Sequence, residues 1–140
     1  MLGIDAGERR IGLALSDELR LLASPLAVLD RRNGLSNVLD TIAALAQREA
    51  VAEVVVGLPL NADGSAGAQA RRAEHFAQLV ERVTQLPVAL WDERLTTQQA
   101  EAIVRAQGRN PRRARASGEV DAVAAAVILQ DFLDTQSRRC

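Results

Sequence analysis

Three acidic residues occupy positions from which their side chains could meet and do chemistry. Asp5 comes directly after a short apolar run, and Glu93 comes after another such run and Asp92, so both lie where a buried strand should end. A carboxylate at such a place is costly unless it is hydrogen-bonded, paired or bound to a cation. Asp121 lies on the first turn of an expected helix, in register with its apolar face, so its carboxylate should point inward. The residues in register with it are Ala125, Ile128 and Phe132.

Convergence of these three carboxylates would form a hard, oxygen-rich site, which suits Mg²⁺ or Mn²⁺ better than zinc. Two such ions about 4 Å apart can activate a water molecule and stabilise the leaving oxygen when a phosphodiester is hydrolysed. This chemistry needs neither histidine nor cysteine, and the chain has one of each, His75 and Cys140. The acids therefore favour a metal-dependent nuclease in which Asp5, Glu93 and Asp121 are both the metal ligands and the catalytic residues.

Each acid also has a simpler structural explanation. Asp5 could accept hydrogen bonds from backbone N–H groups of the turn at Gly7. Glu93 could be a surface acid that pairs with Arg94. Asp121 could complement the helix dipole, although that explains its alignment with the apolar face less well. The residues alone leave these alternatives open.

The hydrophobic pattern predicts the elements that must position the acids. Strands are expected over 2–5, 11–15, 21–29, 53–58 and 88–91, and helices over 35–49, 68–83, 96–107 and 120–133. Pro25 suits an edge strand better than a central one, whereas the run at 54–56 and the segment 88–91 are typical of buried strands. Small alanines in the last helix would let it approach the sheet closely. The order of elements predicts an α/β fold, with a mixed five-stranded sheet flanked by helices.

Length and composition indicate one domain that spans residues 1–140, because 140 residues with 48% apolar content suffice for one ordinary core. The 17 basic and 18 acidic residues give a net charge of −1, so any binding to nucleic acid must depend on local patches. No stretch reaches the roughly 18 apolar residues of a membrane span, and the N-terminus does not resemble a signal peptide. We therefore expect a cytoplasmic protein without a membrane partner.

Arginines before the last expected helix form the most basic segment of the chain. They are Arg109, Arg112, Arg113 and Arg115. Their position beside the predicted site favours contacts with phosphates, although a solvated linker would have a similar composition. Arg9 and Arg10 could hold a second phosphate, and Asn61 lies in a flexible loop that could admit a nucleic-acid backbone. With two Phe, one Trp and no Tyr, we expect recognition by shape and backbone rather than by base stacking.

Four segments resemble motifs of one known family. GIDAGERRIGLALSD at 3–17 is similar to the opening of the YqgF family, also called RuvX, of Holliday junction resolvase-like proteins. Three more segments resemble later motifs of that family, in the same order. They are VGLPLNADGS at 56–65, DERLTT at 92–97 and VDAVAA at 120–125. Any one of these motifs is weak, but four in order over nearly the whole chain form a specific resemblance.

The resemblance implies a ribonuclease H-like fold, a cytoplasmic location and a nuclease that matures the 5′ end of pre-16S ribosomal RNA. It assigns metal ligation to Asp5, Glu93 and Asp121, with Asp92 as the alternative to Glu93. RNA is then the expected partner, and a homodimer is compatible with the sequence. A junction resolvase acting on structured DNA and a nucleic-acid-binding regulatory protein with little hydrolysis stay open. Sugar kinases and actin-like ATPases have a similar opening, but they need two such domains, for which 140 residues leave no room.

Overall fold

A five-stranded sheet with strand order β3-β2-β1-β4-β5 forms the centre of the molecule. The structure is a computed structural model that describes residues 1–61, 63–93, 96–108, 110, 112–113 and 119–138. β1 pairs antiparallel with β2 and parallel with β4, so the sheet is mixed, as predicted. The strands are β1 (Leu2–Ala6), β2 (Arg10–Ser16), β3 (Ala23–Asp30), β4 (Val54–Leu58) and β5 (Val88–Asp92).

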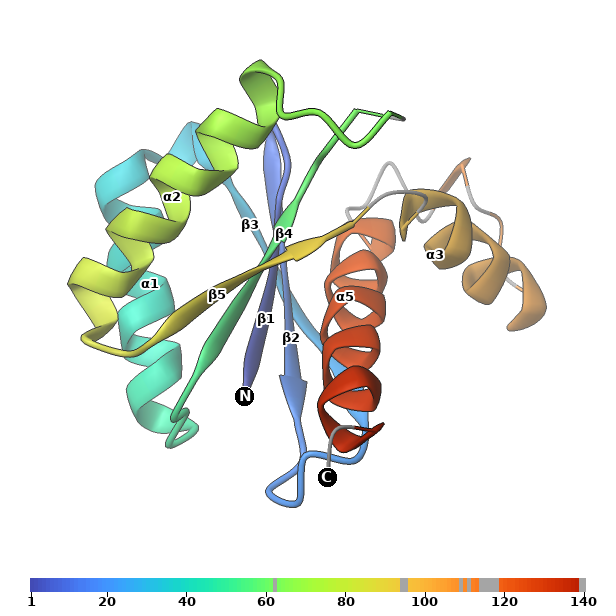
Figure 1. Ribbon diagram of the computed structural model, residues 1–140, viewed down its shortest axis with the longest axis horizontal. Coiled ribbons are helices and arrows are strands. Elements are labelled where there is room, and N and C mark those ends of the chain that lie inside the picture. The colour runs from blue at the N-terminus through green and yellow to red at the C-terminus, as the bar shows by residue number, and fades with distance from the viewer. Residues whose placement is uncertain (62, 94–95, 109, 111, 114–118, 139–140) are drawn as a thin grey trace.

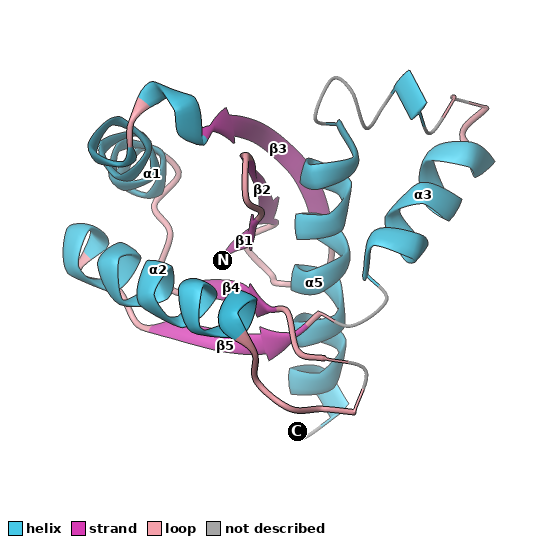
Figure 2. Ribbon diagram, turned by 90° about the horizontal axis from the view of Figure 1, so that it is seen from above, coloured by secondary structure: helices cyan, strands magenta, loops and turns pink. Residues whose placement is uncertain are grey.

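Helices cover both faces of this sheet (Figure 1). Helices α1 (Leu35–Arg48) and α2 (Ala68–Thr84) lie side by side on one face, and α5 (Glu119–Arg138) lies on the other. Helix α3 (Thr96–Ala106) packs on the outer side of α5 (Figure 2), and a short 3₁₀ helix, η1 (Arg31–Asn33), follows β3. Within the residues that the structure describes, no helix is both long enough and apolar enough to cross a membrane.

Alternation along the strands divides the core into two layers, because successive side chains of a strand point to opposite faces. One layer joins Leu2, Ile4 and Val56 to α1 and α2, where Ile42, Phe76 and Val80 are almost completely buried. The other layer joins Ala14 and Val55 to α5, where Ile128 and Leu129 are buried. The run at 54–56 is therefore buried on both faces, as predicted.

Glycines on the second face bring α5 unusually close to the sheet. A Cβ atom at Gly3 would lie 2.8 Å from Leu129 Cβ, and one at Gly12 would overlap the backbone carbonyl oxygen of Asp121. The missing side chains let the start of α5 rest directly on β2. Glycines of the strands, and not the alanines of the helix alone, therefore permit the close approach.

One of the two edge strands was expected and the other was not. β3 is an edge strand, as Pro25 predicted, and its register with β2 shifts between Leu13 and Ala14, where Ala14 faces the proline. β5 was expected to be buried, and that expectation is wrong. It pairs only with β4, so it is the other edge, and Leu90 is 40% exposed. Helix α5 also begins one residue earlier and ends five residues later than predicted.

We expect Gly12→Ala to destabilise the protein, because the new methyl group would displace the start of α5. Overpacking of this kind typically costs about 1–3 kcal/mol. The matched control is Gly67→Ala, where the nearest atom to a new Cβ is the flexible Asn61 amide at 3.3 Å; the loss there should be at most about 1 kcal/mol. Urea unfolding of both variants gives the two values. Equal values would contradict the close contact between Gly12 and α5.

Candidate active site

Two of the predicted acids meet where the parallel strands β1, β4 and β5 have their C-terminal ends, which we call the carboxyl edge of the sheet. β1, β4 and β5 are parallel, so Asp5 near the end of β1 and Glu93 just after β5 lie at the same edge. The Glu93 backbone N–H donates to the Leu58 carbonyl (3.1 Å), which fixes Glu93 beside the end of β4. Its carboxyl group lies over Gly57, where a Cβ would come within 2.5 Å of Glu93 Oε2. A side-chain hydrogen bond then joins Glu93 to Asp5.

Burial and mutual repulsion change the protonation of this acid pair. Burial, the charge of Asp5 and the hydrogen bond to Asp5 raise the pKa of Glu93 to about 9, and the charge of Asp92 adds to the effect. Burial also raises the pKa of Asp5, while the hydrogen bond from Glu93 opposes that change. Glu93 therefore keeps its proton at neutral pH and donates it in the hydrogen bond to Asp5.

The start of α5 places Asp121 against the strand next to Asp5. Its backbone carbonyl packs against Gly12, and Gly12 is the cross-strand partner of Asp5. Asp121 is partly buried, and the residues in register with it, Ala125, Ile128 and Phe132, are buried as predicted. Even so, no three acidic, histidine or cysteine side chains of the described residues lie close enough together to hold one metal ion. The structure thus brings Asp5 and Glu93 into contact and places Asp121 over the neighbouring strand.

Asp92, the alternative to Glu93, has a different role in the structure. Its side chain is exposed, and its charge adds to the effects of burial and of Asp5 that raise the pKa of Glu93. Because the side chains of a strand alternate, Asp92 and Glu93 cannot both face Asp5. The geometry therefore favours Glu93 as the partner of Asp5.

A cleft of about 380 Å³ opens beside the acid pair. Asp5 and Glu93 contribute to its wall, together with Gln69 and two arginines, Arg31 and Arg72. Neither arginine is among the residues predicted above to bind nucleic acid. Arg31 comes directly after β3, just as Glu93 comes directly after β5. Its position relative to a strand is therefore the signal in the sequence that could have identified it.

The predicted nucleic-acid-binding residues that the structure describes do not line this cleft. Arg9 is exposed in the turn after β1, and Arg10 begins β2. The Asn61 amide donates to Ser65 Oγ (3.0 Å) and so stabilises its own loop. Arg112 and Arg113 are exposed, whereas Arg109 and Arg115 lie outside the described residues. Phosphate contacts by all of these residues stay predictions.

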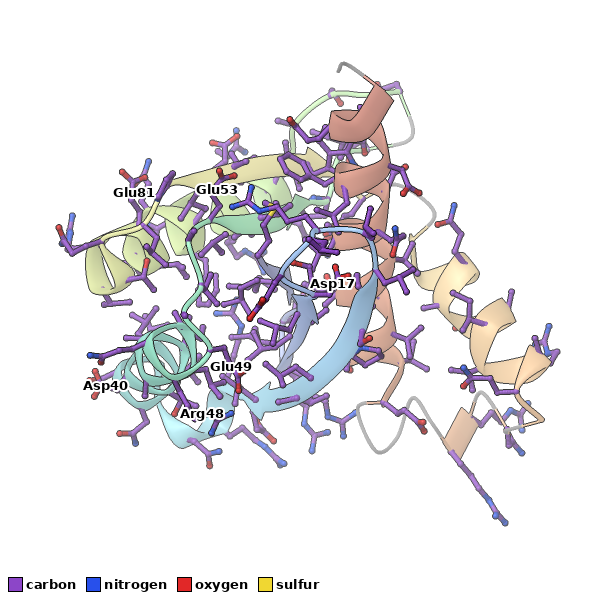
Figure 3. The ribbon with its side chains drawn as sticks, turned by 90° about the horizontal axis from the view of Figure 1, so that it is seen from below. Asp17, Asp40, Arg48, Glu49, Glu53 and Glu81 are labelled. Atoms are coloured by element: carbon purple, nitrogen blue, oxygen red, sulfur yellow. The ribbon has the colours of Figure 1, made fainter. Side chains whose placement is uncertain are left out.

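Acids at the opposite end of the molecule have local partners instead. Figure 3 views the molecule from the end at which β1 begins, with several of these acids labelled. Asp17 accepts hydrogen bonds from the backbone N–H groups of Leu21 and Leu22, and Glu53 pairs with Arg20 at 3.3 Å. These are exposed interactions of the kind that stabilise a surface. Asp5 and Glu93, by contrast, are buried and have each other as partners.

The sheet order, the helices on both faces and the acids at the strand ends together define a domain of the ribonuclease H-like class. Solved structures with this arrangement agree. A Thermus thermophilus RuvC in complex with a Holliday junction substrate matches with a TM-score of 0.58 and 17% identity, over 97% of this chain and 94% of that chain. Another RuvC structure from the same organism matches with a TM-score of 0.57 and 17% identity, over 98% and 95% of the two chains. At this identity the likeness establishes the fold.

The chain belongs to the RuvX family, whose model bears the description "Holliday junction resolvase" and matches residues 1–135. A relative from Anaeromyxobacter sp. (strain Fw109-5) is 51% identical over 133 residues, which is 95% of each chain. A relative from Synechococcus elongatus is 43% identical over 135 residues, or 96% of this chain and 89% of the relative. Both relatives bear the name "Putative pre-16S rRNA nuclease".

We expect Glu93→Gln to stabilise the metal-free protein at pH 8. The Glu93 pKa is about 9 in the folded protein against an ordinary value of 4.5. The folded state therefore binds a proton that the unfolded state has lost, and stability falls as pH rises from about 5 to 9. Glutamine keeps the hydrogen bond without that loss. Melting temperatures measured with EDTA should differ little at pH 4.5 and by several degrees at pH 8.

Glu81→Gln is the matched control for this experiment, because Glu81 is exposed near the end of α2 (Figure 3) and does not line the cleft beside the acid pair. Its melting temperature should follow that of the unchanged protein at every pH. A constant difference between the Glu93→Gln variant and the unchanged protein across the pH range would show that the pair does not share a proton.

Proposed function

We propose that this protein is a divalent-cation-dependent nuclease that matures the 5′ end of pre-16S ribosomal RNA in the cytoplasm, with residues 1–140 acting as one nuclease domain. The observation that carries the proposal is the buried pair of Asp5 and Glu93. The pair lies at the carboxyl edge of the sheet, and Asp121 packs on the strand next to Asp5. The names of the relatives support the choice of RNA, and membership of the RuvX family supports hydrolysis of phosphodiester bonds.

The donors at this edge fit Mg²⁺ or Mn²⁺. All three are carboxylates, and hard divalent cations prefer oxygen ligands. Burial disfavours the ionised form of both carboxyl groups, and the two repel each other once both are ionised, so a cation placed there would offset both effects. Asp5, Glu93 and Asp121 would hold it, and the bound cation would supply an activated water and stabilise the leaving oxygen.

The residues of the chain have three tasks in such a reaction. Glu93 must release the proton that it shares with Asp5 before both groups can act as ligands. Gly57 leaves room for the Glu93 carboxyl group, and the Leu58 carbonyl fixes the Glu93 backbone. The packing of α5 on Gly12 holds Asp121 at the strand beside Asp5. Precise placement of this kind reduces the reorganisation that the reaction requires.

A Holliday junction resolvase is the second candidate, because the family model bears that description. The two candidates share the acid pair and differ in the substrate that the surrounding surface admits. Incubation with a labelled pre-16S RNA fragment, single-stranded DNA and a four-way DNA junction, each with Mg²⁺, Mn²⁺ or EDTA, separates them. We expect RNA cleavage with either metal ion and none with EDTA. Selective cleavage of the junction would favour the resolvase, and binding without cleavage would favour a regulatory protein.

We expect Asp5→Asn to abolish metal-dependent cleavage and to leave the fold intact, because asparagine has nearly the same shape but lacks the charge that a cation needs. Asp40→Asn is the matched control, since Asp40 is an exposed acid on α1. Cleavage assays and circular dichroism of both variants test the assignment. Full activity of the Asp5→Asn variant would exclude Asp5 as a metal ligand.

The arginines before α5 generate a separate prediction. Changing Arg109, Arg112, Arg113 and Arg115 to Ala should weaken RNA binding similarly for unrelated sequences, because phosphates carry no base information. Each lost contact with single-stranded RNA lowers the slope of log affinity against log salt by roughly 0.7, so four would lower it by about 3. A charge-matched variant serves as control. Its four changes to Ala are at Arg20, Arg32, Arg48 and Arg82. The same slope in both variants would identify the segment as a solvated linker.

A further inference from the structure

Two arginines face the same cleft as the acid pair, and the nuclease chemistry proposed above does not use them. Arg31 comes from η1 and Arg72 from the first turns of α2, so elements far apart in the sequence bring two positive charges together. Burial and the nearby charge of Arg72 lower the pKa of the Arg31 guanidinium. Both remain protonated. Two adjacent cations in a cleft favour an anion between them.

Arg31 is held in place by neutral groups. Its Nε donates to the Gly7 carbonyl at 2.7 Å, and its guanidinium lies over the Phe76 ring, 5.1 Å from the ring centre. Its backbone N–H donates to the Arg9 carbonyl (2.8 Å), which ties η1 to the turn after β1. Among the residues that the structure describes, no carboxylate forms an ion pair with Arg31. The terminal nitrogens of a guanidinium oriented in this way can still donate to a ligand.

Arg72 has a partner that a ligand could replace. Its Nη1 lies 3.4 Å from Glu8 Oε1, and the two side chains are 64% and 71% exposed. An exposed ion pair of this length contributes little free energy. Glu8 lies in the wall of the cleft as well, so its carboxylate occupies the side of Arg72 that an incoming anion would approach.

We propose that Arg31 and Arg72 clamp one backbone phosphate of the nucleic acid, adjacent to the phosphate that the acid pair positions for hydrolysis. This inference rests on the proposed nuclease function. Arginine suits the task because its planar fork donates two parallel hydrogen bonds to a phosphate. The strand would then cross the carboxyl edge of the sheet, with the acids on one side and the arginines on the other. Glu8 competes with the phosphate for Arg72.

Binding of RNA to an inactive protein tests the clamp without reference to cleavage. The background is the Asp5→Asn, Glu93→Gln variant, in which the acid pair can carry no negative charge, so that a phosphate can enter the cleft without a metal ion. Fluorescence anisotropy with a short labelled single-stranded RNA in EDTA gives the affinity and its salt dependence. Into this background we introduce Arg72→Gln, Arg72→Lys, Glu8→Gln and the matched control Arg71→Gln, an exposed neighbour of Arg72 on α2.

Each of these changes has a distinct expected effect. Arg72→Gln should weaken binding about tenfold, as for loss of a hydrogen bond to a charged group, and lower the salt slope by roughly 0.7. Arg72→Lys should keep the slope, because the charge stays, but recover only part of the affinity. Glu8→Gln should strengthen binding, and this gain should shrink when Arg72 is also changed. Arg71→Gln should change the affinity less than about twofold.

Arg31 is tested with Arg31→Lys, which keeps the charge and loses the fork. We expect this variant to bind RNA more weakly at an unchanged salt slope. Its melting temperature shows how much stability the contacts of Arg31 with Gly7 and Phe76 supply. Equal affinities and slopes for Arg72→Gln and Arg71→Gln would overturn the clamp, even if the unchanged enzyme cleaves RNA. The expected binding pattern in a protein that cleaves nothing would instead preserve the clamp and refute the nuclease.

Discussion

The contact between two buried carboxyl groups is the constraint on which this end of the molecule depends. Charges of like sign in a medium of low polarity repel strongly, so Asp5 and Glu93 can be neighbours only with a shared proton or a bound cation. The surroundings are shaped accordingly. Gly57 leaves the space that the Glu93 carboxyl group fills, the Leu58 carbonyl holds its backbone, and the second core layer begins immediately beside it with Ile128. The ends of β4 and β5 are thus arranged around the pair.

The two faces of the sheet contribute opposite charges to one cleft. Asp5 and Glu93 lie on the face that α5 covers, whereas Arg31 rests on Phe76, which belongs to the layer under α1 and α2. The cleft therefore crosses the edge of the sheet and is not a pocket within one layer. Such an edge suits an extended polymer better than a small molecule, because a strand can pass over it and meet different charges on the two sides. Net charge, which is −1 for the chain, gives no sign of this local division.

Much of this arrangement could be predicted because it depends on local periodicity. The register of Asp121 with Ala125 indicated an inward-facing acid, and Pro25 indicated an edge strand. The exposure of β5 could not be predicted, because a short apolar run looks the same whether one strand or two lie beside it. The contacts of Arg31 could not be predicted for a related reason. Its role depends on Gly7 and Phe76, which only the folded chain brings to it, and nothing near Arg31 in the sequence records their presence.

Helix α3 is attached to the rest of the molecule in a different way from the other helices. It packs on α5 through a separate small cluster of alanines and valines, which includes Ala100, Val104, Val120 and Val123. Small side chains bury little apolar area, so the free energy that holds α3 in place is modest. Local opening of α3 should therefore cost much less than global unfolding, and its amide hydrogens should exchange with solvent sooner than those of β1 or α5. The protein then comprises two cooperative units, and the acid pair belongs to the one that stays closed.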